Sequence, residues 1–401
     1  MPPVVVLGAG YAGAHAARKA RAAGVDVVVV DPDGCHGLAP RFAGIAAGRM
    51  PAHDAAVPLK DLLDVEVVRD RAVGLDTAAG TIALASGGQL TYGTLVVTVG
   101  ATPSAPPVPG ILEHARPLAS VDDALALRDE VAAAPGNLVV IGGGATGVQL
   151  ASEVARHWRG GHVTVVEREA SLLPGEPRSL GRAARRLLDA VDVEVLLGRS
   201  VTAVDAAGVV LDDGTRRSGT VAWAGGWQAT GSRLRPDAPT RGGRLVVGLD
   251  LAVDGEPEVF AAGDTAAHTD PLGRALPMSA QVAAKAGAVA GHNAAARLLG
   301  RPTRPAVLVE LGRVLEFGGG HAGIGQVGVA RVGPVRLARR PLDRLVPVLH
   351  LGIDLRHLWQ VGGTAAVLRH APGRSRGAEV RRAFRPTPRR APEHAVGRSI
   401  A

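Results

Sequence analysis

The chain has 401 residues, which suggests two or three domains, and its apolar residues (46%) include few aromatics (2%), so we expect aliphatic cores of Ala, Val and Leu. Its single cysteine, Cys35, excludes an intramolecular disulfide and a redox-active cysteine pair. The net charge of +8 is uneven: from Arg331 to the end there are 15 arginines and 4 acidic residues, or +11, which leaves −3 for the first 330 residues.

This basic end is compatible with an anionic membrane surface, with nucleic acid, or with a solvated arginine-rich end without a partner. No window reaches about 18 uninterrupted apolar residues, so we expect no membrane-spanning segment. The chain opens directly into an apolar run, without a basic region or a cleavage site, and we expect no signal peptide. His, Cys, Asp and Glu show no metal-ligand spacing, so we expect no metal.

The first residues of the sequence predict a βαβ unit. A strand, a glycine loop, an Ala-rich helix and a second strand are expected at residues 4–7, 8–13, 14–23 and 27–30. In the loop, Gly8 permits the tight turn, Gly10 lets the backbone approach a pyrophosphate, and Gly13 lets the helix pack close to the sheet. Asp31, at the end of the second strand, is placed to accept hydrogen bonds from ribose hydroxyls. The pattern predicts a dinucleotide site.

The same unit is repeated later in the chain, at residues 138–141, 142–147, 148–157 and 162–166. Its loop glycines are Gly142, Gly144 and Gly147, and Glu167 closes its second strand. A carboxylate there accepts from the ribose 2′-hydroxyl and repels a 2′-phosphate, which favours NADH over NADPH. The adjacent Arg168 leaves NADPH as the alternative.

The remaining elements follow in chain order. Pro-rich residues 103–110 and residues 232–239 indicate two crossings between domains. Further expected elements are a buried strand at 259–262, a long helix at 279–299, Gly-rich strands after 301, an amphipathic helix at 342–359 containing Pro347, and disorder beyond 371. His350 and His357, on the helix at 342–359, are interpreted as surface groups.

These elements predict an α/β fold of two Rossmann-like dinucleotide-binding domains, the second inserted in the first. The expected domains are residues 1–108 with 235–300, residues 109–234, a C-terminal interface region at 301–370, and a disordered basic tail at 371–401.

Four further segments carry a family resemblance. They are Thr98-Val-Gly-Ala-Thr-Pro103, Thr220-Val-Ala-Trp-Ala-Gly-Gly226, Val259-Phe-Ala-Ala-Gly-Asp264 and Pro277-Met-Ser-Ala-Gln281. With the two glycine loops, they resemble the two-dinucleotide flavoproteins (the pyridine nucleotide-disulfide oxidoreductase fold) over roughly residues 4–300. Within that family the chain looks most like the type II NADH dehydrogenases, which are NADH:quinone oxidoreductases.

The resemblance implies FAD at the first loop and NADH at the second, with hydride passing from NADH to FAD and then two electrons to a quinone. The residues it implies for FAD are Gly8, Gly10, Gly13, Asp31, Thr102, Gly263, Asp264 and Ala280. Those for NADH are Gly142, Gly144, Gly147, Glu167 and Gly225. Tyr11 is interpreted either as a shield for the flavin ring or as a plain loop residue.

The chain departs from the family at two of its three candidate catalytic residues. Gln149 stands where type II NADH dehydrogenases commonly carry Glu, and Gln281 keeps the first Gln of the family's AQxxxQ pattern while Lys285 replaces the second. The family's disulfide members use a cysteine pair, and Cys35 is interpreted as structural or incidental. The aromatic-rich C-terminal anchor of type II NADH dehydrogenases is matched only in part.

Two alternative functions stay open. One is an NAD(P)H-dependent reductase of a soluble redox protein such as ferredoxin or rubredoxin, docked through the basic tail. The other is a redox sensor resembling apoptosis-inducing factor. We expect a cytoplasmic protein that attaches peripherally to the inner face of the cell membrane or stays soluble, with no nucleic-acid partner, and a homodimer is one alternative for its oligomeric state.

Overall fold

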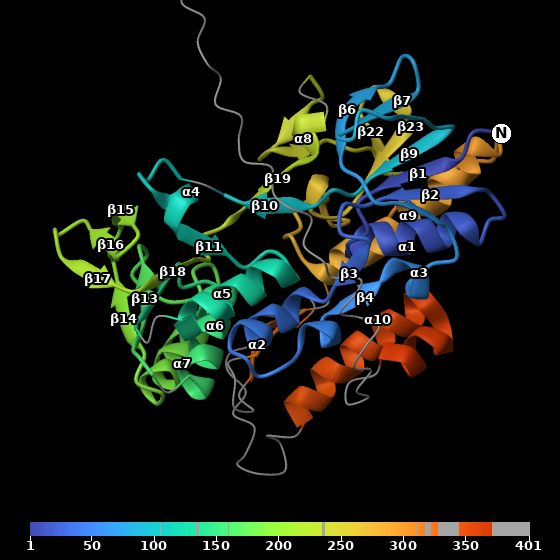
Figure 1. Ribbon diagram of the computed structural model, residues 1–401. Helices are drawn as coiled ribbons and strands as arrows, with labels where there is room; N and C mark the ends of the chain where they lie inside the picture. Colours follow the sequence, from blue (N-terminus) through green and yellow to red (C-terminus); the bar gives the residue numbers. More distant parts are fainter. Residues whose placement is uncertain are drawn as a thin grey trace, which may run out of the picture.

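A computed structural model describes residues 1–104, 106–133, 136–158, 160–234, 237–310, 312–316, 322–327 and 345–370 (Figure 1). These residues form two large, mainly parallel β-sheets, one in each lobe of the molecule, and several smaller sheets. The expected basic tail, residues 371–401, lies outside the described residues.

The first sheet has six strands and holds both strands of the first glycine-loop unit. In order across the sheet the strands are β22 (Ala252–Val253), β23 (Glu256–Ala261), β9 (Thr94–Val97), β1 (Val4–Leu7), β2 (Val27–Val30) and β5 (Glu66–Val68). β1 runs parallel to both of its neighbours, and all four of its side chains are buried. A fully apolar strand is what a central position in a parallel sheet requires.

The second sheet has five strands, and the neighbouring strands are parallel throughout. Their order is β11 (Ala115–Pro117), β18 (Thr220–Trp223), β12 (Leu138–Ile141), β13 (Val163–Glu167) and β14 (Glu194–Leu197). β12 and β13 are the two strands of the second glycine-loop unit.

The second sheet is inserted into the first along the chain. β9 and β23 are neighbours in the first sheet, although the whole second sheet lies between them in sequence. The chain leaves and returns through an antiparallel pair, β10 (Ala101–Pro103) and β19 (Trp227–Ala229), which lies between the lobes (Figure 1). The predicted α/β fold, one Rossmann-like unit inserted in another, is confirmed. The boundaries between residues 108 and 109 and between 234 and 235 stay a prediction.

Two helices of the first lobe pack unusually closely. α1 (Tyr11–Arg21) follows the first glycine loop, and α9 (Ala280–Leu298) lies against it (Figure 1). Gly287 and Gly291 lie one turn apart on α9, where an added Cβ would overlap the backbone of Ala12 or Ala16. Glycine at these two positions therefore lets α9 approach the start of the cofactor-loop helix.

Helices of the second lobe cover its sheet and also contact the first part of the chain. They are α5 (Val121–Ala133), α6 (Ala145–His157) and α7 (Arg178–Asp189). The short helix α2 (Phe42–Ala46) comes from the first part of the chain, and Phe42 and Ile45 share one apolar cluster with Leu127 and Leu150 of the second lobe. The two lobes are thus joined by an apolar contact as well as by the β10–β19 crossing.

The C-terminal helix differs from its prediction. α10 (Leu345–His370) is longer than the expected helix at 342–359 and packs on α1 and on α3 (Leu59–Leu62). Pro347 falls in its first turn, where a backbone N–H has no intrahelical partner, so the helix accommodates it. Gly363, with φ +66°, divides α10 into two helices joined by a kink.

The interpretation of His357 as a surface group is wrong. His357 is only 6% exposed, because α10 lies on α1 instead of standing free in solvent. The side chain of His350 lies outside the described residues. No described helix is both long and apolar enough to cross a lipid bilayer.

The smaller elements are short strands and single helical turns. The strands are β3 (Cys35–Gly37), β4 (Ala56–Pro58), β6 (Ala72–Asp76), β7 (Thr81–Leu84), β8 (Gln89–Thr91), β15 (Val201–Asp205), β16 (Gly208–Leu211), β17 (Arg216–Ser218), β20 (Thr240–Arg241), β21 (Arg244–Leu245), β24 (Gly312–Glu316) and β25 (Ala322–Val327). The helical turns are η1 (Ala39–Arg41), η2 (Ala52–Asp54), α4 (Ile111–His114), α8 (Gly231–Leu234) and η3 (Gly263–Thr265).

Candidate functional site

The first glycine loop is closed at both ends and open in the middle. Gly8 has φ +86°, and an added Cβ would lie 2.7 Å from the carbonyl oxygen of Thr98. A Cβ on Gly13 would overlap the carbonyl oxygen of Gly8, whereas a Cβ on Gly10 would meet nothing within 4 Å. The loop therefore has free space only where a pyrophosphate would approach, in front of the N-terminus of α1.

Asp31 fixes this loop from the end of β2. Its Oδ2 accepts a hydrogen bond from the backbone N–H of Ala9 at 2.8 Å, and its Oδ1 accepts from those of Asp33 and Gly34 at 3.0 Å each. Asp31 is 8% exposed, so the carboxylate is held by backbone donors at the carboxyl end of the sheet. This is where the sequence places the ribose contact.

The second glycine loop repeats this geometry. Gly142 has φ +111°, and a Cβ on Gly147 would overlap the Gly142 carbonyl oxygen, while Gly144 has open space. Glu167 occupies the position in this loop that Asp31 occupies in the first. Its Oε2 accepts from the N–H of Gly143 at 2.6 Å, and its Oε1 accepts from that of Glu169 at 2.8 Å. The chain thus holds two loops of one shape, each with its own buried carboxylate.

Arg168, the residue that left NADPH open, lies at the surface of the protein. Its side chain is 78% exposed and pairs with Glu169 at 3.5 Å. Glu167 itself is 6% exposed. The acid, and not the arginine, is therefore the residue built into the second loop.

Two segments that resemble the flavoprotein family, residues 98–103 and 259–264, converge on the first loop. Thr98 donates a hydrogen bond through its hydroxyl to the carbonyl of Leu7 at 2.8 Å, beside Gly8. The N–H of Gly100 donates to the hydroxyl of Thr265 at 2.8 Å, which ties this segment to the turn that carries Asp264. A Cβ on Gly263 would lie 2.9 Å from the Cβ of Ala12, at the start of α1.

Two half-buried polar side chains of these segments have few hydrogen-bond partners among the described residues. Burial raises the pKa of the Asp264 carboxyl, and the nearby Arg244 guanidinium opposes that rise. The Thr102 hydroxyl is buried and has no hydrogen-bond partner in the part of the chain that the structure describes. Both groups have the chemistry to bind the hydroxyls and polar ring atoms of a flavin nucleotide.

α9 places the remaining candidate residues of the first lobe. Ser279 caps the helix by accepting from the N–H of Val282 at 3.4 Å, and Ala280, the first residue of the helix, is exposed. Gln281 and Lys285 are four residues apart on α9 and so share one face. The Lys285 ammonium donates to the carbonyl of Val309 at 3.2 Å.

The candidates of the second lobe lie on different elements. Gln149 is half-buried on α6 and so belongs to the second lobe. Gln281 and Lys285 lie on α9 and so belong to the first lobe. Gly225 is exposed, and a Cβ there would overlap the indole ring of Trp223. These roles for Gln149 and Gly225 stay predictions.

A partly buried ion pair between the lobes was not predicted. Glu153 on α6 accepts from the Arg49 guanidinium at 2.8 Å, and its side chain is 7% exposed. His157, one turn later, lies 3.5 Å from the same carboxylate oxygen. Since Arg49 and Glu153 are separated by 104 positions, only the folded chain shows this pairing.

Cys35 has the properties of an unreactive thiol. It is half-buried on β3, and burial, together with Asp33 and Asp31, raises the pKa of its thiol to about 12. The nucleophilic thiolate is therefore not formed near neutral pH. Among the described residues, no three His, Cys, Asp or Glu side chains form a group that could hold a metal ion.

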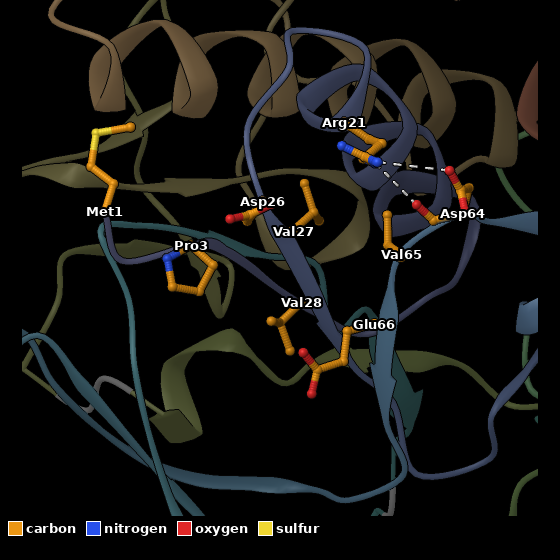
Figure 2. A pocket seen from close by; sticks show the side chains of 9 residues that line it. All are labelled: Met1, Pro3, Arg21, Asp26, Val27, Val28, Asp64, Val65 and Glu66. Atoms are coloured by element: carbon orange, nitrogen blue, oxygen red, sulfur yellow. Dashed lines mark hydrogen bonds and ion pairs between the residues drawn. The ribbon is translucent and has the colours of Figure 1, made fainter.

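A cavity of about 510 Å³ lies at the amino-terminal edge of the first sheet, which is the wrong edge for a dinucleotide. Met1, Asp26 and Glu66 line it at the amino ends of β1, β2 and β5 (Figure 2). Ligands of open α/β sheets bind at the carboxyl ends of the strands, where both glycine loops lie. We therefore place the functional site at the loops.

Two such loops on two mainly parallel sheets, one inserted in the other, define a two-dinucleotide oxidoreductase fold. Residues 2–287 match the family described as pyridine nucleotide-disulphide oxidoreductase, and the chain belongs to this family. It is a member without a cysteine pair, since its sequence has one cysteine.

Named relatives narrow this class. The chain is 30% identical to the type II NADH:quinone oxidoreductase Ndh of Mycobacterium tuberculosis, over 66% of this chain and 67% of that protein. It is 25% identical to the alternative NAD(P)H-ubiquinone oxidoreductase C1 of Arabidopsis thaliana, over 86% of this chain and 77% of that protein. The structure of NDH2 from Plasmodium falciparum in complex with NADH matches with a TM-score of 0.76 at 14% identity, covering 92% of this chain and 97% of that one.

Proposed function

We propose that this protein oxidises NADH, using FAD bound at the first glycine loop, and passes the electrons to a quinone. One observation carries the proposal: a single chain holds two glycine loops of the same geometry, each open at its middle glycine and each with a buried carboxylate. The names of the relatives support NADH and a quinone as the two substrates.

The residues around the first loop fit FAD. The open space at Gly10 and the N–H groups of the first turn of α1 would receive the pyrophosphate. Asp31 would bind the adenosine ribose, and Asp264 the ribitol, since both carboxyls lie at this edge of the first sheet. When bound, FAD supplies the centre that accepts a hydride from NADH and gives two electrons to an acceptor.

The second loop would bind NADH by the same physical means. The free space at Gly144 and the start of α6 would receive its pyrophosphate, and Glu167 its adenosine ribose. A buried carboxylate at this place disfavours the additional phosphate of NADPH, so we propose NADH as the preferred donor.

The start of α9 would border the reacting part of the flavin. The N-terminus of this helix carries a partial positive charge, which stabilises negative charge on a neighbouring group. Gln281 and Lys285 would meet the acceptor there. Lys285 already donates to Val309, so its ammonium is held in place instead of moving freely.

We also propose peripheral membrane attachment through the C-terminal region, since a quinone acceptor resides in the bilayer. On α10, Ile353, Trp359 and Leu368 are 50%, 58% and 56% exposed, and most of the arginine-rich sequence beyond Arg331 flanks this helix. Each basic residue near an anionic surface contributes about 1 kcal/mol, and salt screens this attraction.

The membrane proposal is tested by co-sedimentation with anionic and neutral liposomes. Full-length protein should bind anionic vesicles at low salt, and a chain ending before Arg336 should not. Equal binding of the two chains would rule out attachment through the C-terminal region and favour a soluble acceptor.

The function is tested with a panel of acceptors under steady-state turnover. Short-chain quinones should be reduced at the expense of NADH, whereas ferredoxin and rubredoxin should not. Fast reduction of a soluble redox protein with slow quinone reduction would overturn the quinone assignment. Slow turnover with every acceptor, together with a stable complex with NADH, would favour the redox sensor.

A further inference from the structure

Three buried histidines from three distant segments form one chain of ring contacts next to the first glycine loop. They are His15 on α1, His36 on β3 and His357 on α10, with exposures of 7%, 0% and 6%. His15 Nε2 lies 3.3 Å from His357 Nδ1, and His357 Nε2 lies 2.9 Å from His36 Nε2. His36 Nδ1 lies 2.9 Å from the carbonyl oxygen of Ala9.

The contact between His36 and the Ala9 carbonyl fixes the direction of every hydrogen bond among the three histidines. A carbonyl oxygen only accepts, so His36 Nδ1 carries the proton and donates to Ala9. In the neutral rings, His36 Nε2 must then accept from His357 Nε2, and His357 Nδ1 must accept from His15 Nε2. The three neutral rings therefore satisfy all three contacts in one arrangement, and His357 is the link that uses both of its nitrogens.

The two nitrogens of His357 point to opposite neighbours, so the three rings do not converge on one ion. This agrees with the lack of a metal-binding group among the described residues. The rings also pack on Tyr11, whose ring centre lies 5.0 Å from that of His36 and 4.6 Å from that of His357. The cluster is thus a polar contact between α10 and the cofactor loop.

Ala9 is the residue on which the contact acts. Its N–H donates to Asp31 at 2.8 Å, and its carbonyl accepts from His36, so the residue is held from both sides. Ala9 and Tyr11 flank Gly10, the glycine with open space in front of it. Any shift of His36 or His357 would therefore move the backbone that faces the pyrophosphate.

α10 is fixed beside this cluster by an ion pair. The Arg41 guanidinium donates to Asp354 at 2.6 Å and to the carbonyl of Asp54 at 2.7 Å. The Arg41 and Asp354 side chains are 12% and 9% exposed, so solvent screens the pair only weakly. Asp354 and His357 lie three residues apart on α10, so the ion pair sets the depth at which the His357 ring enters the cluster.

We propose that His357 is a positioning residue for the cofactor: through His36 it fixes the Ala9 carbonyl, so that the docking of α10 sets the affinity of the first glycine loop for FAD. This inference rests on the proposed function for the identity of the cofactor. It assigns to the C-terminal helix a part in FAD binding although the helix follows the family-matched residues 2–287.

The cluster makes this affinity sensitive to acid. Burial lowers the pKa of all three imidazoles, most of all through the cost of a buried positive charge, and lowers that of His15 from 6.5 to about 4. The docked state therefore binds fewer protons than the released one between these two pH values. Its stability is complete above pH 6.5 and declines as the pH falls towards 4.

Other charged and titratable groups face the cluster from each element packed around it. They are Tyr11, Arg18 and Lys19 on α1, Asp31 after β2, Arg41 before α2 and Asp354 on α10. At the far end of α10, away from the cluster, Arg369 and His370 pair with Asp61 of α3. Arg18 and Lys19 oppose a proton on His15, whereas Asp31 and Asp354 favour one on His36.

The experiment measures the dissociation constants of FAD and of NADH on full-length protein stripped of flavin. The variants are His357→Phe, which removes both hydrogen bonds, and His357→Gln, which can still donate and accept but does not titrate. Arg356→Gln is the matched control, because Arg356 is the exposed neighbour of His357. His357→Phe should weaken FAD binding by about tenfold while His357→Gln weakens it less, and neither should change NADH binding.

The wild type supplies a second test if His357→Phe does not fold. As the pH is lowered from about 7.5 to about 5.5, the affinity for FAD should fall while the affinity for NADH stays constant. In His357→Gln the affinity for FAD should depend less on pH. The inference would be overturned if His357→Phe bound FAD with wild-type affinity, or if Arg356→Gln weakened FAD binding as much as His357→Phe does. It would also be overturned if the affinities for FAD and NADH depended on pH to the same extent. A wild type that binds no FAD at any pH would instead overturn the proposed function.

Discussion

The two glycine loops of this chain differ in the group that holds the carbonyl before the open glycine. In each loop, a carboxylate at the end of the second strand accepts from the N–H of the residue before the open glycine, Ala9 in the first loop and Gly143 in the second. The carbonyl of Gly143 accepts from the backbone N–H of Leu173 at 2.8 Å, within the same lobe. The carbonyl of Ala9 accepts from the side chain of His36, which itself contacts α10.

The difference shows how one loop geometry can serve two purposes. A backbone donor does not titrate and belongs to the lobe, so the second loop depends only on its own sheet. The first loop depends on a side chain that titrates and on a helix from the other end of the chain. The backbone-held second loop suits a substrate that must bind and leave in every turnover. The histidine-held first loop suits a resident cofactor.

The largest effect is expected from closing the open glycine of each loop. Gly10 and Gly144 have φ −65° and −72°, and a Cβ at either meets nothing within 4 Å, so valine is compatible with the fold. Gly10→Val should yield colourless protein that still binds NADH. Gly144→Val should yield yellow protein that NADH no longer reduces.

Flavin content by absorbance and NADH binding by fluorescence, measured on both variants, check this pair of outcomes. Stoichiometric FAD in Gly10→Val would show that the cofactor is not held at the first loop.

A smaller effect is expected at the acid of the second loop. Glu167→Ala removes a carboxylate that would accept from the ribose hydroxyls and also holds Gly143, so the KM for NADH should rise about tenfold or more. The preference for NADH over NADPH should narrow, because the repulsion of the 2′-phosphate is lost. Initial rates with both nucleotides measure the change, and a wild type that strongly prefers NADPH would point to Arg168 instead.

A selective effect is expected at the start of α9. Gln281→Ala should lower turnover with a quinone several-fold while leaving the reduction of the flavin by NADH unchanged. The reason is that Gln281 is proposed to meet the acceptor and not the donor. Stopped-flow measurement of flavin reduction separates the two half-reactions, and slower flavin reduction in the variant would place Gln281 on the nicotinamide side.

The smallest effect is expected at the only cysteine. Cys35→Ser should change neither half-reaction by more than about twofold, because burial keeps the thiol protonated. Steady-state turnover before and after treatment with a thiol-alkylating reagent gives an independent check. Loss of activity in Cys35→Ser would indicate a redox part for this residue.

The sequence was sufficient for those features that local backbone geometry determines. Gly8, Gly13, Gly142 and Gly147 occupy positions where a Cβ would collide with a backbone atom of another residue. Such steric demands leave a pattern with fixed spacing, so the two loops, their strands and the α/β fold could be predicted.

Contacts between distant segments leave no such pattern. His36 and His357 are separated by 321 positions, and the spacing of histidines along α10 gave no reason to bury one of them. The same holds for Arg49 and Glu153, which join the two lobes. Burial of these polar groups depends on which helix docks where, and this is decided by tertiary packing.

An anaerobic titration with NADH tests the central claim, that two loops bind two different nucleotides and exchange a hydride, most directly. Purified protein with bound FAD is titrated without any acceptor, and the absorbance of the oxidised flavin is followed. We predict that one equivalent of NADH reduces one FAD, and that Gly144→Val abolishes this bleaching while retaining the flavin. The account would be contradicted if NADH did not reduce the flavin of the wild type. It would also be contradicted if NADH reduced the flavin of Gly144→Val at the wild-type rate.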